Sequence, residues 1–137
     1  MSLKLLAAGA LVATLAVSTA SAQQPHWANY DTLETQMFFG TFGSDEKGVS
    51  AKDWADFLAN EITPRFPDGL TVASVYGQGA GGPPHGVIAE NTKMLIVVHP
   101  DTSEAAEKLG ELKKAYKERF GQTGVFHTRQ SVEVVTD

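Results

Sequence analysis

The pattern of apolar and polar positions along the chain predicts four strands and two helices. Apolar positions recur at helical spacing over residues 50–63 and again over residues 101–120. Apolar runs rich in aromatic and β-branched residues are typical of strands, and they cover residues 35–42, 70–76, 93–99 (with a possible start at Val87) and 125–135. The order of elements is therefore β-α-β-β-α-β.

Start and stop signals support both helices. Ser50, followed three residues later by Asp53, forms a capping box, and Pro64 predicts that the first helix ends near the residue before it. Asp101 and the acidic residue three positions on predict the start of the second helix. Gly121 is a typical C-terminal stop. The Gly- and Pro-rich stretch between the second and third strands is expected to form a mobile hairpin loop.

This order of elements predicts an α+β fold, specifically a ferredoxin-like split βαβ sandwich. In that fold an antiparallel sheet carries both helices on one face, and the first and third strands lie in its centre. Both central strands are apolar on both faces, with Met37 and Phe39 against Phe38 and Phe42, and Met94, Ile96 and Val98 against Leu95 and Val97. A central strand that faces water on one side should alternate instead. We expect the open face to be covered by a second protomer, by the N-terminal segment or by an apolar ligand, and we favour the protomer.

The first 22 residues have the pattern of a cleaved secretory signal peptide. Lys4 precedes an apolar core over residues 5–17, which is too short to cross a bilayer, and small residues stand before a cleavage site between Ala22 and Gln23. We therefore expect a periplasmic or secreted protein that keeps no membrane anchor after cleavage. Residues 23–34 are expected to be a flexible lead-in to one domain over residues 35–137.

Composition narrows the classes of function. The chain has 16 acidic against 11 basic residues, and Lys4 would leave with the leader, so the acidic balance argues against nucleic acid, whose phosphates demand clustered Lys and Arg. With no cysteine there is no disulfide, thiol catalysis or iron–sulfur cluster. The glycines of Gly77–Gly82 match a G-x-G-x-x-G motif, but no helix start follows to receive a pyrophosphate. We expect no cofactor and no metal site.

Polar residues near strand ends are the candidates for ligand binding. Tyr76, Gln78, Glu90 and Lys93 bracket the expected hairpin, and they could converge on a polar site or pair across the strands. The end of the third strand and the start of the fourth are expected at one sheet edge, which could bring His99 and His127 within reach of each other across the first strand; the alternative is two separate histidines at strand ends. A cation just after the first helix can bond the last carbonyls of that helix or bind an anion. The full set is Arg65, Tyr76, Gln78, Glu90, Lys93, His99, His127 and Arg129.

Five segments of the sequence together resemble the bacterial family known as domain of unknown function 3574. They are Met37–Gly40, Thr63–Val72 with its Thr-Pro-Arg-Phe-Pro-Asp-Gly-Leu run, Tyr76–Gln78, Glu90–Lys93 and Ala115–Gln122. The resemblance implies a small exported bacterial protein and supplies no activity. This chain lacks the lipid-anchor cysteine of some members, and its glycine-rich hairpin replaces a more usual aromatic and acidic one.

Two functions follow as hypotheses. The first is a non-catalytic binding or interaction module that forms a homodimer through its open sheet face. The second is a small enzyme, or a cofactor or ligand binder, of the dimeric α/β-barrel type, in which two sheets enclose a pocket. Phe38 would line that pocket together with Tyr76, His99, His127 and Arg129. No residue pattern identifies a catalytic group, so the sequence leaves open whether the protein is an enzyme.

Overall fold

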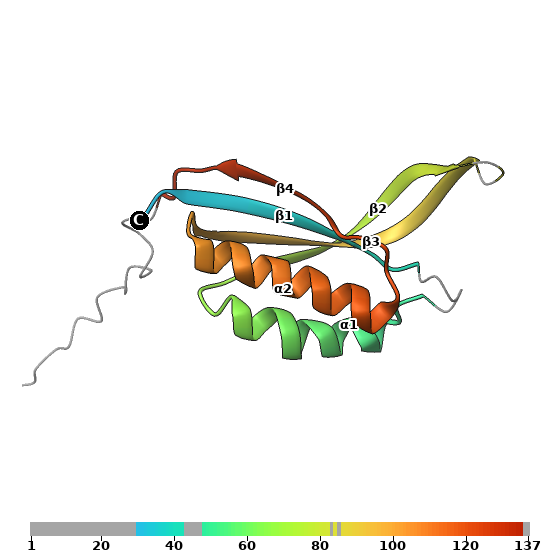
Figure 1. Ribbon diagram of the computed structural model, residues 1–137, viewed down its shortest axis with the longest axis horizontal. Coiled ribbons are helices and arrows are strands. Elements are labelled where there is room, and N and C mark those ends of the chain that lie inside the picture. Colours follow the sequence, from blue (N-terminus) through green and yellow to red (C-terminus); the bar gives the residue numbers. More distant parts are fainter. Residues whose placement is uncertain (1–29, 43–47, 83, 85, 136–137) are drawn as a thin grey trace, which may run out of the picture.

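A four-stranded antiparallel sheet carries two helices on one of its faces (Figure 1). The computed structural model describes residues 30–42, 48–82, 84 and 86–135. The strand order is β2-β3-β1-β4, so the first and third strands are central, as expected. The predicted α+β fold is confirmed, and its elements are β1 (Thr32–Gly40), α1 (Ala51–Phe57), β2 (Thr71–Gly82), β3 (Gly86–Pro100), α2 (Ser103–Phe120) and β4 (Phe126–Ser131).

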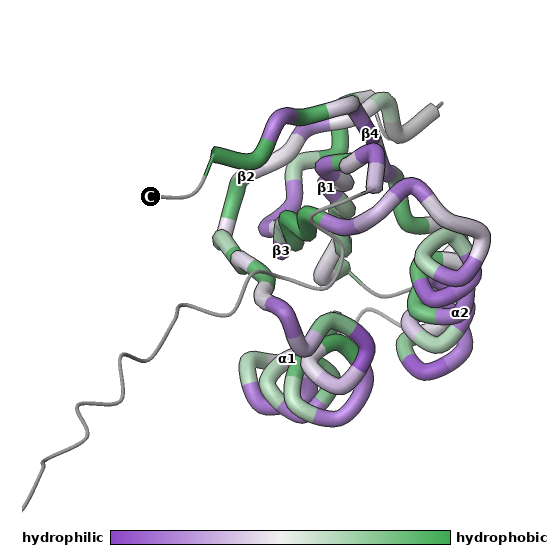
Figure 2. Tube along the Cα trace, turned by 90° about the vertical axis from the view of Figure 1, so that its left-hand side faces the viewer, coloured by the Kyte–Doolittle hydropathy of each residue, from purple (hydrophilic) through white to green (hydrophobic). Residues whose placement is uncertain are grey.

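The core lies between the sheet and the helices. Both helices lie on the same side of the sheet, and strongly hydrophobic residues are concentrated along β3 (Figure 2). Tyr116 of α2 is fully buried at the centre, with its ring 4.8 Å from Phe39, 5.2 Å from Phe57 and 4.9 Å from Phe120 between centroids. Aromatic pairs in this geometry stabilise the fold by more than the burial of their apolar area alone.

The first helix begins where the sequence predicts, but its α-helical part ends at Phe57, before the expected end near Thr63. The Ser50 hydroxyl accepts a hydrogen bond from the Asp53 amide at 3.1 Å and donates one to the Asp53 carboxylate at 2.6 Å. After Phe57 the chain continues through a π-helical segment, Leu58–Ile62, and a 3-10 turn, Thr63–Arg65. Pro64 lies inside that last turn and the Thr63 backbone before it is still helical, so the helical path continues to Arg65 and does not end before the proline as expected.

The second helix starts one residue later than predicted. Thr102, and not Asp101, is the N-cap, because its extended backbone lets its hydroxyl accept a hydrogen bond from the Ala105 amide at 3.2 Å. The expected stop at Gly121 is confirmed, with a φ of +62° in the left-handed region that favours glycine.

Residues 77–82 and Gly86, which were expected to lie in a loop, are instead part of two long strands. The glycines of β2 pair directly with β3, Gly77 with Glu90 and Gly79 with Ile88, and the hairpin extends past the ends of the helices (Figure 1). The next element after Gly82 is the strand β3 and not a helix. This glycine run therefore does not lead into a helix N-terminus that could bind a nucleotide phosphate, as expected. The backbone hydrogen bonds of the partner strand hold these glycines extended despite their low strand propensity.

Two strand limits also differ from the predicted ones. β1 begins at Thr32, inside the expected lead-in, and β4 ends at Ser131 and not at Val135. The two differences have one cause. β4 pairs only with β1 and runs antiparallel to it, so the end of β4 is set by the start of β1. Their register places Leu33 opposite Ser131, and the Val132 amide makes a last bond to the Thr32 carbonyl at 3.0 Å. Beyond that point β4 has no partner strand.

The two faces of the sheet differ in the way the register dictates. On β1 the odd positions from Leu33 to Phe39 are buried toward the helices, and the even positions point to the opposite face. We call this opposite side the open face. On β1 this face carries Glu34 and Gln36, so the expectation that β1 is apolar on both faces is wrong. Phe42, which that expectation counted as part of the strand, lies beyond its end at Gly40. Most apolar positions of the open face lie on the β2–β3 half and include Ala73, Val75, Met94, Ile96 and Val98, whereas Phe38 and Phe126 lie on the β1–β4 half.

Candidate functional site

A pocket of about 560 Å³ opens on the open face, beside the start of the hairpin extension. All four strands contribute to it, because the register sets their side chains on the same side of the sheet. Apolar walls with few polar groups are typical of small-molecule sites. The side chains that line it from this face are Phe38, Val75, Ile88, Glu90, Thr92 and Phe126.

Glycines of β2 make the pocket hollow. A Cβ atom built on Gly77 would first meet the Thr92 hydroxyl oxygen at 3.5 Å, and one built on Gly79 would meet nothing within 4 Å. Neighbouring strands still hold the backbone in place through their hydrogen bonds. Space remains above the sheet because no side chain fills it at these two positions.

Glu90 supplies the charge of the pocket. Its carboxylate lies directly over Gly40, where a Cβ atom would come within 2.8 Å of both carboxylate oxygens. The Phe42 amide donates a long hydrogen bond of 3.3 Å to one of these oxygens. Among the described residues, no Lys or Arg forms an ion pair with Glu90. The carboxylate therefore keeps acceptor positions that a ligand can use.

The glycine under Glu90 also connects the pocket to the core. The Tyr116 hydroxyl, on the helix side, donates a hydrogen bond of 2.7 Å to the Gly40 carbonyl. Burial raises the pKa of the Tyr116 phenol, and the nearby negative charge of Glu90 raises it further. The phenol therefore stays protonated as a donor beneath the pocket floor.

Two aromatic rings form the opposite wall. Phe38 of β1 and Phe126 of β4 are paired in the register, with ring centroids 5.7 Å apart and planes tilted by 39°. Phe126 is 68% exposed, which is unusual for a phenylalanine on a strand. An exposed aromatic pair beside a carboxylate offers both a ring face and a charge to a ligand.

The structure does not bring the four predicted hairpin residues together on one face. Tyr76 and Gln78 border the pocket, but the register pairs them with Asn91 and Ala89, so their side chains leave from the face opposite to that of Glu90, where the Gln78 amide donates to the Tyr76 hydroxyl at 3.2 Å. Lys93 also lies on the face opposite to Glu90, and its ammonium donates to the Ser74 hydroxyl at 2.7 Å. Thr92, which also lines the pocket, gave no signal in the sequence.

Phe126 was missed as a site residue because strand pairing alone reveals its place. It follows Val125 in an apolar pair at the start of the last strand, which is ordinary for a strand. Only the register, which sets Phe126 opposite Phe38, shows that the two rings form one wall.

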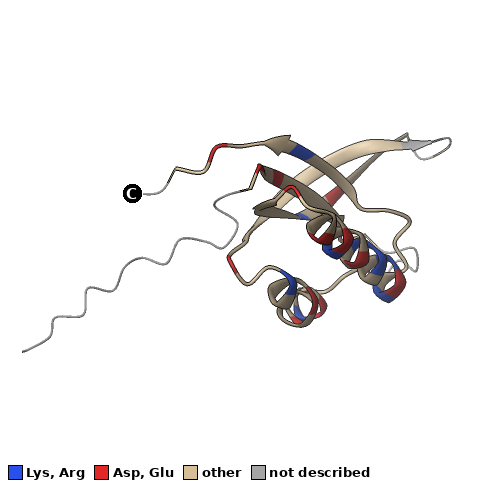
Figure 3. Ribbon diagram, turned by 60° about the vertical axis from the view of Figure 1, so that its left-hand side comes forward, with Lys and Arg blue, Asp and Glu red and all other residues tan. Residues whose placement is uncertain are grey.

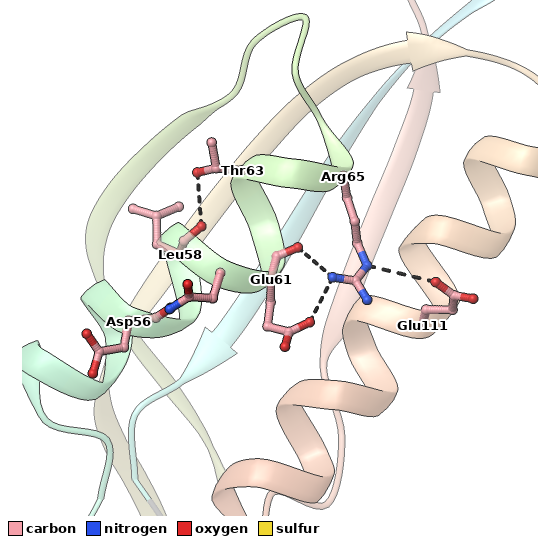
Figure 4. Close-up of polar contacts among 7 residues, drawn as sticks. Asp56, Leu58, Glu61, Thr63, Arg65 and Glu111 are labelled. Atoms are coloured by element: carbon pink, nitrogen blue, oxygen red, sulfur yellow. Dashed lines mark hydrogen bonds and ion pairs between the residues drawn. The ribbon is translucent and has the colours of Figure 1, made fainter.

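Arg65 is held in local structure by Glu61 and Glu111, although its buried Nε makes no hydrogen bond with the described residues (Figure 4). Its guanidinium donates to the Glu61 carbonyl at 2.7 Å and to the Glu61 carboxylate at 2.8 Å, and its Nε lies 3.9 Å from the Glu111 carboxylate. The predicted bond to the last carbonyls of the helix is therefore present. Two carboxylates beside this guanidinium disfavour an anion at the same place.

The predicted proximity of the two histidines is wrong. β3 and β4 are each antiparallel to β1, so they run parallel to each other and the end of β3 lies opposite the end of β4. His99 pairs with Leu33 and His127 with Met37, and these positions are separated by about 13 Å along the sheet.

Each histidine has a separate local environment. His99 is buried, with its ring nitrogens 2.8 Å from the Thr35 hydroxyl and 2.9 Å from the Pro100 carbonyl. The carbonyl contact requires a proton on Nδ1. The pKa of His127 is lowered, first by burial and then by the positive charges of Lys113 and Arg129.

Charge is distributed unevenly over the fold. Most of the acidic and basic residues lie on the two helices, and few lie on the sheet (Figure 3). Within the described ranges, no three His, Asp or Glu side chains are grouped closely enough to hold a metal ion, and no helix is long and apolar enough to span a membrane. The predicted cleavage site at Ala22 and Gln23 lies outside the described residues.

Comparison with solved structures shows a similar fold in a phage SAM lyase. Its complex with S-methyl-5′-thioadenosine is 18% identical, has a TM-score of 0.60, and the match covers 79% of this chain and 87% of that chain. Its apo form is also 18% identical, with a TM-score of 0.59 and coverage of 85% of this chain and 92% of that chain. At this identity the similarity concerns the fold alone.

Comparison with protein families identifies the family to which the chain belongs. No curated protein matches the sequence. The family described as "Protein of unknown function (DUF3574)" matches residues 34–135, which is most of the chain and includes every described strand and helix except the start of β1. The protein therefore belongs to the DUF3574 family.

Proposed function

We propose that this protein is a non-catalytic binding module that associates with a second copy of itself through the open face. The observation that carries this proposal is an apolar strip on the β2–β3 half of that face, formed by Ala73, Val75, Met94, Ile96 and Val98. The helices lie on the other side of the sheet (Figure 2). A contiguous apolar surface of this kind is typical of an interaction site.

The absence of charged residues from this strip favours a second copy of the chain as the partner. None of its five residues is charged, so two strips can meet about a two-fold axis without like charges opposing each other. The polar β1–β4 half of the face carries Glu34, Gln36, Thr128 and Gln130, which can lie at the rim of such an interface, and the Glu34 carboxylate there accepts hydrogen bonds from the Gln36 and Gln130 amides.

Light scattering of the purified protein, with variants matched in charge, tests this proposal. Ile96→Lys would bury an unpaired ammonium in the interface, and it should convert a dimer into a monomer. Ala106→Lys adds the same charge to the exposed side of α2 and should leave the dimer intact. A wild-type protein that is monomeric at all concentrations, or an Ile96→Lys variant that stays dimeric, contradicts the proposal.

A second candidate is a small-molecule binder or enzyme that uses the open-face pocket. The pocket volume supports this candidate, as does the similar fold of the phage SAM lyase in complex with S-methyl-5′-thioadenosine. Calorimetric titration with that nucleoside tests it. Binding that is lost in Gly77→Val, where a side chain enters the pocket, supports this candidate, and the absence of binding heat opposes it.

The site of action is a separate proposal that rests on the leader sequence alone. We propose export to the periplasm or beyond, with cleavage between Ala22 and Gln23. Mass spectrometry of the protein recovered from an exporting bacterial host measures the mature N-terminus. A mature chain that begins at Gln23 supports export, whereas a chain that retains Met1 and stays in the cytosol contradicts it.

A further inference from the structure

We propose that the open-face pocket binds a small organic cation, such as a quaternary ammonium group, between the Glu90 carboxylate and the rings of Phe38 and Phe126. This inference rests on the pocket alone and does not require self-association. The three side chains come from β1, β3 and β4, and they all line one cavity of about 560 Å³. A volume of that size accepts an organic ligand and exceeds what a single ion needs.

The electrostatics of the pocket select a cation. Glu90 is the only acidic or basic residue among the described residues that line the pocket. It is partly shielded from water, and none of the described basic residues pairs with it. A carboxylate that is partly removed from water gains from a cationic partner. The binding of an anion would place like charges together.

The walls of the pocket select an organic cation over a metal ion. The faces of Phe38 and Phe126 attract a cation through their ring quadrupoles, which favours a soft, weakly hydrated charge. Calcium and magnesium ions instead require about six oxygen ligands. Among the described residues that line the pocket from the open face, Thr92 offers the single polar group besides Glu90, a hydroxyl, and the Tyr76 and Gln78 side chains leave from the opposite face.

The positions of the glycines agree with a bulky head group. Gly40 lies beneath the Glu90 carboxylate, and Gly77 stands across from it in the β2–β3 register. Both positions leave the space around the carboxylate free of other side chains. An alkylated nitrogen, which is wider than a lysine ammonium, can therefore approach Glu90 while its methyl groups contact the rings.

Titration with choline, followed by amide chemical shifts in NMR, tests this inference. The matched neutral probe is 3,3-dimethyl-1-butanol, which has the shape of choline and no charge. We expect saturable shifts at Glu90, Thr92 and Phe126, with a dissociation constant of about 1 mM or lower, and binding of the neutral probe that is about tenfold weaker. Equal binding of both probes, or the absence of saturable shifts, overturns the inference.

Two carboxylate variants localise the effect. Glu90→Gln should weaken choline binding about tenfold, because it removes the charge that faces the pocket. Glu34→Gln removes a carboxylate from the same sheet face outside the pocket, and it should leave choline affinity unchanged. An equal loss in both variants, or no loss in Glu90→Gln, overturns the assignment. The comparison of the two probes on the wild-type protein decides the question even if Glu90→Gln fails to fold.

Discussion

The hydrogen bond between Tyr116 and Gly40 predicts a measurable loss of stability on removal of a single oxygen. Tyr116→Phe keeps the ring that packs between Phe39 and Phe57, and it deletes only the donor to the Gly40 carbonyl. The bond measures 2.7 Å and the side chain is fully buried, so water cannot replace the lost donor. We expect a destabilisation of about 1 to 2 kcal/mol, within the range for a buried hydrogen bond whose acceptor loses its partner.

The same variant should change the response of stability to alkaline pH. The pKa of the Tyr116 phenol is raised above its ordinary value of 10.0 in the folded protein, because burial and the charge of Glu90 oppose ionisation. In the unfolded chain the phenol ionises near its ordinary pKa, so the wild-type protein loses stability as pH rises above 10. Tyr116→Phe should lose less stability over this interval, since it has no phenol at this position.

Urea unfolding, monitored by circular dichroism, measures both effects. At neutral pH a loss of this size lowers the urea midpoint by about 1 M for a domain of this length. Tyr30→Phe is the matched control: this side chain is 56% exposed, and its replacement should shift stability by less than about 0.5 kcal/mol. If Tyr116→Phe is as stable as the wild type, the bond to Gly40 contributes nothing net, and the reasoning is refuted.

Three further predictions concern separate parts of the structure. Ser50→Ala removes the cap of α1, and it should lower the free energy of unfolding by about 1 kcal/mol in the same urea assay. Gly40→Ala forces the Glu90 carboxylate to move, so it should weaken choline binding while shifting the urea midpoint little; unchanged binding would contradict this. In a proton NMR titration His127 should show a pKa below 6.5, and Lys113→Ala should raise it, although burial should keep it below 6.5.

The helices and the order of elements could be predicted because their signals are local. The capping box at Ser50, the missing amide of Pro64 and the left-handed Gly121 each act within a few residues of their position. Apolar periodicity then identified the buried side of α2, where Leu109, Leu112 and Tyr116 all lie in the core. Local chemistry therefore determined most of these limits. The cap of α2 was displaced by one residue, and α1 gave way to a π-helical segment at Leu58, before its expected end near Thr63.

Features that depend on strand pairing could not be predicted in the same way. The end of β4 at Ser131 follows from where β1 begins, and the separation of His99 from His127 follows from strand direction. The open face was judged from apolar residues alone, which passed over Gln36 inside the expected strand and hid Glu34, because that strand was expected to begin after it. A shift of three residues in one boundary thus changed the composition of a whole face.

The glycines of the hairpin explain both why a loop was expected where the strands lie and why the open face has a pocket. Low strand propensity made residues 77–86 look like a loop, since glycine adds no side-chain packing to a strand. The absence of side chains at Gly77 and Gly79 is also what leaves the pocket open above Glu90. Strand conformation there is stabilised by pairing with β3 and not by local preference. Valine in place of Gly77 would strengthen the strand and fill the pocket. Glycine at this position therefore lowers the stability of the strand and keeps the pocket open.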